Sequence, residues 1–346
     1  MSNAELTKAI KEKALELGYV KCGVTTLDPF PEYDEELSSR KGYERFAGGG
    51  LNGQVTLPEG AEDAKCVISC IDSFAEWEFP SELTPYIARA YQSKLYGGVA
   101  PGLNAQKHVE FLEYLHEQGI RTFNAPNFMQ MPDRAIAARA GLISYGRNNF
   151  AYSGKHGSLI IITNIVVDAD LETEVHPPKS HCPADCRRCI DACPTKALDD
   201  QGRLIPTRCV LYNNMFPGAM LDKSVRDQLG VRIHGCDECQ NACPRNKEAI
   251  FGANKQPQPL LEELAETFSL KAVLQGTEEQ FADTLGRIIS PYFKEFDRHR
   301  RNAAIAMGNS GNVAFIPALE QAAANDENEE VREAAQWAAE KLKAAL

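Results

Sequence analysis

Eight of the eleven cysteines in this chain lie between positions 182 and 243, about a sixth of its 346 residues. They are regularly spaced, as Cys182-x3-Cys186-x2-Cys189-x3-Cys193-Pro194, then Cys209, then Cys236-x2-Cys239-x3-Cys243-Pro244. Cysteine runs that end in Cys-Pro are typical of bacterial ferredoxins with two iron–sulfur clusters. Because eight thiolates suffice for two four-iron clusters, the pattern predicts a two-cluster module.

The ferredoxin pattern also predicts which cysteines share a cluster. In such runs the cysteine before proline ligates the other cluster. One cluster would therefore be held by Cys182, Cys186, Cys189 and Cys243, and the second by Cys193, Cys209, Cys236 and Cys239. One interval departs from the usual run, because three residues separate Cys182 from Cys186 where two are common.

Two other uses of these cysteines are less consistent with the sequence. Disulfides need an oxidising compartment, and the first ten residues show no basic flank followed by an apolar run. Zinc binds paired C-x2-C hooks, but it takes four ligands per ion and does not explain the two Cys-Pro endings. Iron–sulfur clusters are therefore the preferred interpretation.

Length and charge limit the range of functions. A chain of 346 residues suits two or three domains, and its net charge of −11 disfavours broad binding to nucleic acid or anionic membranes. No apolar run reaches the length of a membrane span. We expect a soluble, cytoplasmic monomer.

The first 177 residues alternate between helix and strand patterns. Apolar spacing predicts helices at Ala4–Leu17, Ala105–Gln118 and Arg134–Ala140, and strands at Tyr19–Val24, Cys66–Ile71, Ile120–Phe123 and Leu159–Val167. This alternation is typical of an α/β domain. The glycine-rich segment 48–53 matches no nucleotide-binding motif and is interpreted as a turn. Cys22, Cys66 and Cys70 lie in apolar runs and are expected to be buried.

After the cysteines the pattern becomes helical only. Helices are predicted at Glu262–Leu274, Glu278–Ile289, Arg301–Asn309, Ala314–Ala324 and Glu329–Leu346. Paired helices at this spacing resemble a HEAT-type unit, which needs a neighbour to cover its apolar face. We therefore expect three domains, at 1–177, 178–252 and 253–346, the last docked on the others.

Several motifs together resemble the epoxyqueuosine reductases, cobalamin-dependent tRNA-modifying enzymes related to reductive dehalogenases. The similarity covers most of the chain from Pro132 onward. Its motifs are Asp133-Arg134-Ala135, Gly146-Arg147-Asn148, Cys189-Ile190-Asp191-Ala192-Cys193-Pro194, Arg208-Cys209 with Tyr212, Ile233-His234-Gly235-Cys236, Cys239-Gln240, and Arg301-Asn302-Ala303.

The resemblance implies a corrinoid-reductase-like α/β domain that binds cobalamin and receives electrons through two [4Fe-4S] clusters. It implies an external electron donor of the flavodoxin or ferredoxin kind, and epoxyqueuosine in tRNA as substrate. On this basis Asn127, Asp133, Tyr145 and Arg147 are candidate catalytic residues, with Tyr91 near the substrate. Candidate cofactor-binding residues are Arg134, Asn148, Tyr212 and Gln240.

The chain departs from this family at several places. The family's catalytic aspartate corresponds by position to Asn127, whose amide cannot serve as a general acid near neutral pH. Asp133 could take the role, although an aspartate in the first turn of a helix also has a structural explanation. Arg245 stands where tryptophan is common, and the chain lacks the clear basic stripe that a tRNA partner usually requires.

Two alternatives follow from these departures. The same chemistry could act on another small electrophile, as in reductive dehalogenases, or the protein could be an electron-transfer module without its own substrate.

The segment Asp297-Arg298-His299 lacks the glycine of the motif through which other proteins offer histidine to cobalt, and is interpreted as a solvated helix face.

Overall fold

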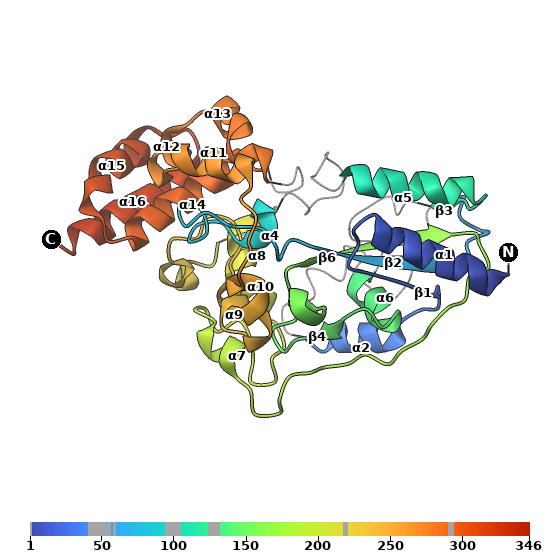
Figure 1. Cartoon of the computed structure of the whole chain (residues 1–346). Coiled ribbons are helices and arrows are strands. Elements are labelled where there is room, and N and C mark those ends of the chain that lie inside the picture. The colour runs from blue at the N-terminus through green and yellow to red at the C-terminus, as the bar shows by residue number, and fades with distance from the viewer. Residues whose placement is uncertain are drawn as a thin grey trace.

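The computed structural model describes residues 2–40, 57, 60–93, 105–123, 132–216, 221–289 and 294–346. These residues form an α/β part, a cysteine-containing module and a group of C-terminal helices, with the module between the other two (Figure 1). The glycine-rich segment and Asn127 lie outside the described residues. Within them, no helix is long and apolar enough to cross a membrane.

A four-stranded sheet forms the centre of the α/β part. Its order is β1 (Lys21–Thr26), β2 (Cys66–Ser73), β6 (Ile160–Val167) and β3 (Thr122–Phe123). The predicted strands are therefore present. Helix and strand alternation is typical of parallel sheets, but all three pairings of this sheet are antiparallel.

Helices cover both faces of this sheet. Helices α1 (Asn3–Glu16) and α5 (Ala105–Glu117) lie on one face, and α6 (Asp133–Arg139) and α2 (Pro31–Ser38) on the other (Figure 1). Even-numbered residues of β2 face the first pair, and Cys66 and Cys70 are fully buried there, as expected. Cys22 is half-buried, with its Sγ 3.6 Å from that of Cys70. Helix α2 was not predicted from the sequence.

The cysteine module consists of short helices and turns. Its helices are α7 (Arg188–Ala192), α8 (Val210–Met215), α9 (Glu238–Asn241) and α10 (Lys247–Phe251). The α/β part contributes α4 (Arg89–Gln92) and a small hairpin of β4 (Ser144–Tyr145) and β5 (Ala151–Tyr152). Both lie against this module, because Arg89 pairs with Asp237 and the hairpin contacts the cysteine loops described below.

The C-terminal helices are α11 (Pro259–Thr267), α12 (Leu270–Gln275), α13 (Glu278–Asp283), α14 (Phe296–Asn309), α15 (Ile316–Asn325) and α16 (Glu329–Lys343). The single helix predicted at Glu262–Leu274 is two helices. The break lies at Ser269, which has an extended backbone and caps α12 by accepting a bond from the Ala272 amide. Their core also includes Leu83, Val210 and Ile233, so the predicted docking is present.

Candidate iron–sulfur and active site

Seven of the eight cysteines between positions 182 and 243 fall into two neighbourhoods. Burial raises the pKa of the Cys189 thiol, and the nearby thiols of Cys243 and Cys182 raise it further. Burial likewise raises the pKa of Cys239, followed by the effects of Cys236, Cys209 and Cys193. These are the neighbours that the ferredoxin pattern assigns to the same cluster, and the assignment of individual ligands stays a prediction.

Backbone amides point at two of these sulfurs. The amide of Arg147 donates to Sγ of Cys182 at 3.4 Å, and the amide of Ala197 donates to Sγ of Cys193 at 3.3 Å. Hydrogen bonds to cysteine sulfur stabilise negative charge and influence the reduction potential of iron–sulfur clusters. The donor set of eight thiols with directed amides fits two clusters.

The β4–β5 turn joins the α/β part to both halves of the cysteine module. The guanidinium of Arg147 donates to the carbonyl oxygens of Cys186 at 2.6 Å and Ala184 at 3.1 Å. Asn148 donates to the carbonyl of Cys239 at 3.2 Å. Asn149, in a left-handed conformation with φ 66°, donates to the carbonyl of Gly202 at 2.9 Å. Arg147 was predicted to be catalytic. Its described contacts are with the segment from Cys182 to Cys186, called here the cysteine hook.

The four candidate cofactor residues have extensive contacts within the protein. Asn148 also donates to the Tyr152 hydroxyl at 2.9 Å. Gln240 accepts from Ser158 at 2.7 Å and donates to Asp237 at 2.9 Å. Tyr212 is buried and stacks on Phe216, and Arg134 donates to the carbonyl of Asn149. Their role in holding a cofactor stays a prediction.

Asp133 lies at the start of α6, beside the central strand β6. Asn164 of β6 donates to its carboxylate at 2.7 Å. Burial raises the pKa of Asp133 to about 6, against the lowering effects of the Asn164 bond and the Arg134 charge. A carboxyl with such a pKa is protonated for about a tenth of the time at pH 7, and a general acid near neutral pH needs a pKa raised in this direction.

Two buried polar atoms near Asp133 have no hydrogen-bond partner among the described residues. They are Oδ1 of Asn164 and Oγ of Ser69. Ser69 and Asn164 are directly paired on β2 and β6, so their side chains share one face of the sheet. These atoms could bind a polar group that the chain itself does not supply.

Tyr145 and Tyr91 occupy different environments. Burial raises the pKa of Tyr145 to about 12, and the charge of Arg134 acts against this rise. Tyr91 is buried, with its ring edge on the His234 ring at 4.8 Å between centroids. Tyr145 therefore lies near the start of α6, whereas Tyr91 packs against the cysteine module.

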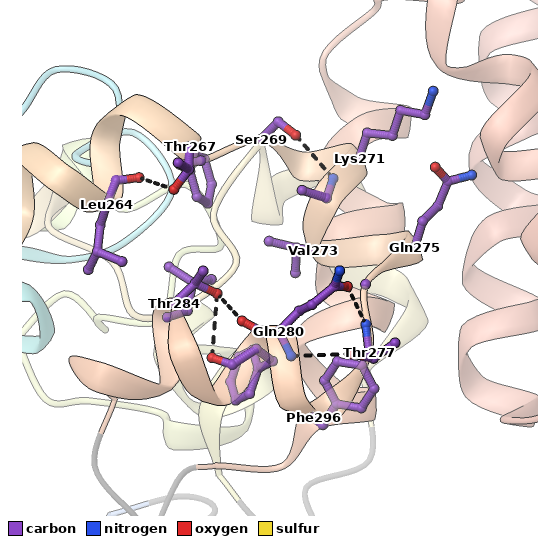
Figure 2. Close-up of a pocket in the computed structure, with 15 residues that line it drawn as sticks. Leu264, Thr267, Ser269, Lys271, Val273, Gln275, Thr277, Gln280, Thr284 and Phe296 are labelled. Atoms are coloured by element: carbon purple, nitrogen blue, oxygen red, sulfur yellow. Dashed lines mark hydrogen bonds between the residues drawn. The ribbon is translucent and has the colours of Figure 1, made fainter.

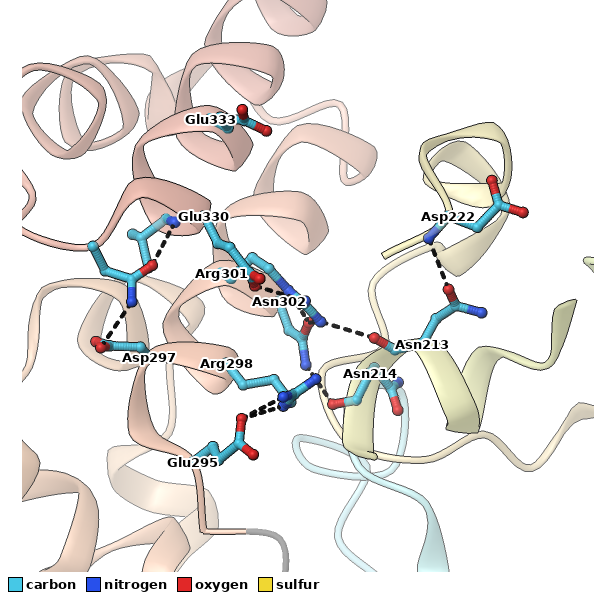
Figure 3. A network of polar contacts seen from close by, with 12 residues as sticks. Asn213, Asn214, Asp222, Glu295, Asp297, Arg298, Arg301, Asn302, Glu330 and Glu333 are labelled. Atoms are coloured by element: carbon cyan, nitrogen blue, oxygen red, sulfur yellow. Dashed lines mark hydrogen bonds and ion pairs between the residues drawn. The ribbon is translucent and has the colours of Figure 1, made fainter. Parts of the chain in front are cut away.

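A network of polar contacts connects the C-terminal helices to α8, which follows Cys209, and to the loop before Cys236 (Figure 3). Asn302 of α14 donates to the carbonyls of Asn214 at 2.7 Å and Ile233 at 2.8 Å. Arg301, which is 1% exposed, donates to the carbonyl of Asn213 at 2.8 Å and pairs with Glu330 at 3.0 Å. The sequence analysis noted these residues as motifs but did not predict that they meet.

The prediction of a solvated helix face at Asp297-Arg298-His299 was wrong for two of these residues. Arg298 and His299 are buried, and Nε2 of His299 lies 3.0 Å from Nδ1 of His234. The basic and polar composition of this segment suggested an exposed face. In the structure, α14 packs this side against the loop before Cys236.

A pocket of about 520 Å³ lies among the C-terminal helices α11 to α13, away from the cysteines (Figure 2). Most of its polar side chains are engaged in hydrogen bonds within the protein. Ser269 and Thr277 cap their helices, and Thr284 donates to the carbonyl of Gln280 at 2.6 Å. The pocket therefore presents few free polar groups to a ligand.

Comparison with known proteins agrees with the geometry. Residues 181–246 match the model of a 4Fe-4S double cluster binding domain. The epoxyqueuosine reductase of Lactococcus garvieae is 30% identical over 97% of this chain and 96% of its own length. The chain belongs to the epoxyqueuosine reductase family.

Other relatives extend this result over nearly the full length. The epoxyqueuosine reductase of Bacillus subtilis is 28% identical over 99% of this chain and 89% of its own length. A crystal structure of an epoxyqueuosine reductase with an epoxyqueuosine-modified tRNA-Tyr stem loop has a TM-score of 0.79, at 24% identity, covering 99% of this chain and 91% of that one. This member of the epoxyqueuosine reductase family is thus an iron–sulfur oxidoreductase.

Proposed function

We propose that this protein reduces epoxyqueuosine to queuosine in tRNA, with electrons that pass through two [4Fe-4S] clusters to cobalamin. The observation that carries the proposal is the family membership over 97% of the chain, combined with the two thiol neighbourhoods. When bound, cobalamin would supply the cobalt centre that delivers electrons to the substrate. An enzyme is favoured over an electron-transfer module because the likeness includes the whole α/β part.

The residues around Asp133 fit a polar cofactor on that face of the sheet. Ser69 and Asn164 offer buried polar atoms without partners among the described residues, and cobalamin carries amide side chains that could bind them. Arg134, Tyr145 and Tyr212 stay candidates for the same role or for binding substrate.

Asp133 is our candidate for the proton donor when the epoxide oxygen leaves. Its pKa of about 6 suits a general acid near neutral pH, and the bond from Asn164 fixes its orientation. Asn127, which the spacing in the sequence matches to the family's catalytic aspartate, cannot perform this proton transfer.

The test is restoration of queuosine in a bacterial strain that lacks its own reductase. The chain should restore queuosine, whereas Asp133→Asn should fail although its clusters are intact. If Asn127→Asp raises the activity and Asp133→Asn does not lower it, Asp133 is not the donor. Absence of restoration by folded, cluster-loaded protein would contradict the tRNA function.

Cobalamin binding has a separate test. Protein reconstituted with iron, sulfide and cobalamin should retain corrinoid absorbance after desalting. Ser69→Ala should weaken this retention because it removes the hydroxyl and changes the side-chain volume little. Ser310→Ala, at the exposed end of α14, is the control and should retain the cofactor. No retention by any of these proteins would contradict the cofactor assignment.

The proposal includes the partners and the shape of the C-terminal region. A flavodoxin or ferredoxin-like protein would reduce the clusters, and the enzyme would act as a cytoplasmic monomer. The helical pairs α11 to α16 would stack in a HEAT-like manner, since they share one apolar core with the preceding part.

A further inference from the structure

Tyr152 reaches from the α/β part into the cysteine module. The tyrosine lies on β5 and is 2% exposed, and its hydroxyl lies next to the Cys243 thiol, with the Cys239 thiol also among its neighbours. Cys243 is in turn a neighbour of Cys189. The phenol thus contacts Cys243. In the predicted assignment this residue completes the cluster held by Cys182, Cys186 and Cys189.

Asn148 determines which way the hydroxyl proton points. Its Oδ1 accepts from the Phe150 amide at 3.3 Å, so its Nδ2 is the end that faces Tyr152. This Nδ2 donates to the Tyr152 oxygen at 2.9 Å. Because that oxygen already accepts a bond and a phenol has a single proton, the proton is directed towards the sulfur of Cys243.

A positive charge lies against the same ring. The guanidinium of Arg245 stacks on the Tyr152 ring, with its carbon 4.0 Å from the centroid. Ser144 holds this guanidinium in place through a bond of 2.5 Å from Nη2 to Oγ. A cation over a phenol ring attracts the ring electrons and makes the hydroxyl a stronger hydrogen-bond donor.

We propose that Tyr152 and Arg245 together raise the reduction potential of the cluster to which Cys243 belongs. One-electron reduction of a [4Fe-4S] cluster adds one negative charge, which is shared with the cysteine sulfurs. A directed O–H donor and a nearby guanidinium stabilise that charge, and such contacts with sulfur are among the determinants of cluster potential. Tyr152 is a positioning residue, since it acts through Cys243. The inference rests on the proposed ligand assignment.

The experiment is a redox titration of the cluster-loaded protein followed by electron paramagnetic resonance. Tyr152→Phe removes the hydroxyl and keeps the ring, whereas Arg245→Gln removes the charge and can still bind Ser144. Each variant should lower the potential of one cluster by about 30 to 60 mV, a three- to tenfold loss of the reduced form at fixed potential. The other cluster, whose Cys239 thiol also lies near Tyr152, should shift less.

The matched control is Tyr19→Phe. Tyr19 is also a buried tyrosine of the α/β part, 4% exposed, but it lies on the other side of the sheet and bonds to His108 at 3.4 Å. Its removal should leave both potentials unchanged. If Tyr152→Phe and Arg245→Gln behave as this control does, or shift both clusters equally, the inference is wrong.

If Tyr152→Phe loses iron, Arg245→Gln decides the question, because it leaves the phenol in place. Loss of queuosine formation without a change in potential would contradict the tuning role and leave the proposed function intact. A changed potential in the variants, together with a wild-type protein that makes no queuosine, would support the tuning role and contradict the tRNA function.

Discussion

The Asp133 carboxyl should make the stability of the protein depend on pH. Its folded pKa of about 6 lies above the ordinary value near 3.8, so folding takes up a proton between these two values. The cost of burying the charged carboxylate is absent below pH 3.8, grows as the pH rises, and is complete above the folded pKa of about 6. Wild-type protein should therefore lose stability over this range.

Asp133→Asn removes the charge and keeps an acceptor for Asn164. The variant should be more stable than wild type at pH 8, and its advantage should grow by about 1 kcal/mol from pH 5 to pH 8. Anaerobic urea unfolding at both values measures this difference. Asp191→Asn, an exposed aspartate of α7, is the control and should show an equal offset at both values. An advantage of Asp133→Asn that does not grow with pH would contradict the raised pKa.

At the scale of elements, α14 supports the loops that carry two cluster cysteines. Asn302→Ala removes two bonds to the buried carbonyls of Asn214 and Ile233, and should cost about 2–4 kcal/mol of unfolding free energy. It should also reduce the iron content of the purified protein, because these loops lead to Cys209 and Cys236.

The same helix provides the control. Asn309 also donates to two carbonyls, of Arg226 at 3.1 Å and Gly230 at 3.0 Å, in the segment further from the cysteines. Asn309→Ala should cost about 1 kcal/mol, because the residue is only half-buried, and should leave the iron content unchanged. Equal iron loss in both variants would show a general loss of stability instead of specific support.

The sequence predicted elements better than it predicted their contacts. The strands at Cys66–Ile71 and Leu159–Val167 were found because buried strands are continuous apolar runs. Such runs say nothing about direction, so the antiparallel pairing was not predictable. Helix α2 begins at Pro31 within an acidic segment with a weak apolar stripe, which explains why it was missed.

The same distinction applies to the candidate site. Cysteine spacing is a local signal, and it predicted the two thiol neighbourhoods. The contacts of Arg147 with the Cys186 carbonyl and of His299 with His234 join residues 39 and 65 positions apart, and no local pattern encodes them. Asn127 lies outside the described residues and stays a prediction.

At the scale of the whole molecule, Arg147 links the α/β part to the hook of Cys182 and Cys186. This hook is exposed and contains no regular helix or strand before α7, so outside contacts must hold its two cysteines. Arg147→Ala removes both guanidinium bonds, each worth about 1.5–3 kcal/mol for a charged donor. The hook should then open more often, and the cluster should bleach at least about tenfold faster in air or chelator.

Arg187→Ala is the matched control, because this arginine lies in the same hook and forms an exposed ion pair with Asp200 at 2.9 Å. Exposed pairs contribute about 0–1 kcal/mol, so cluster loss should change little. The decay of the cluster absorbance measures both variants. If Arg147→Ala keeps its cluster as long as Arg187→Ala does but forms no queuosine, the catalytic role predicted from sequence is favoured. If the cluster bleaches early, Arg147 holds the two parts of the enzyme in the geometry that electron transfer between them requires.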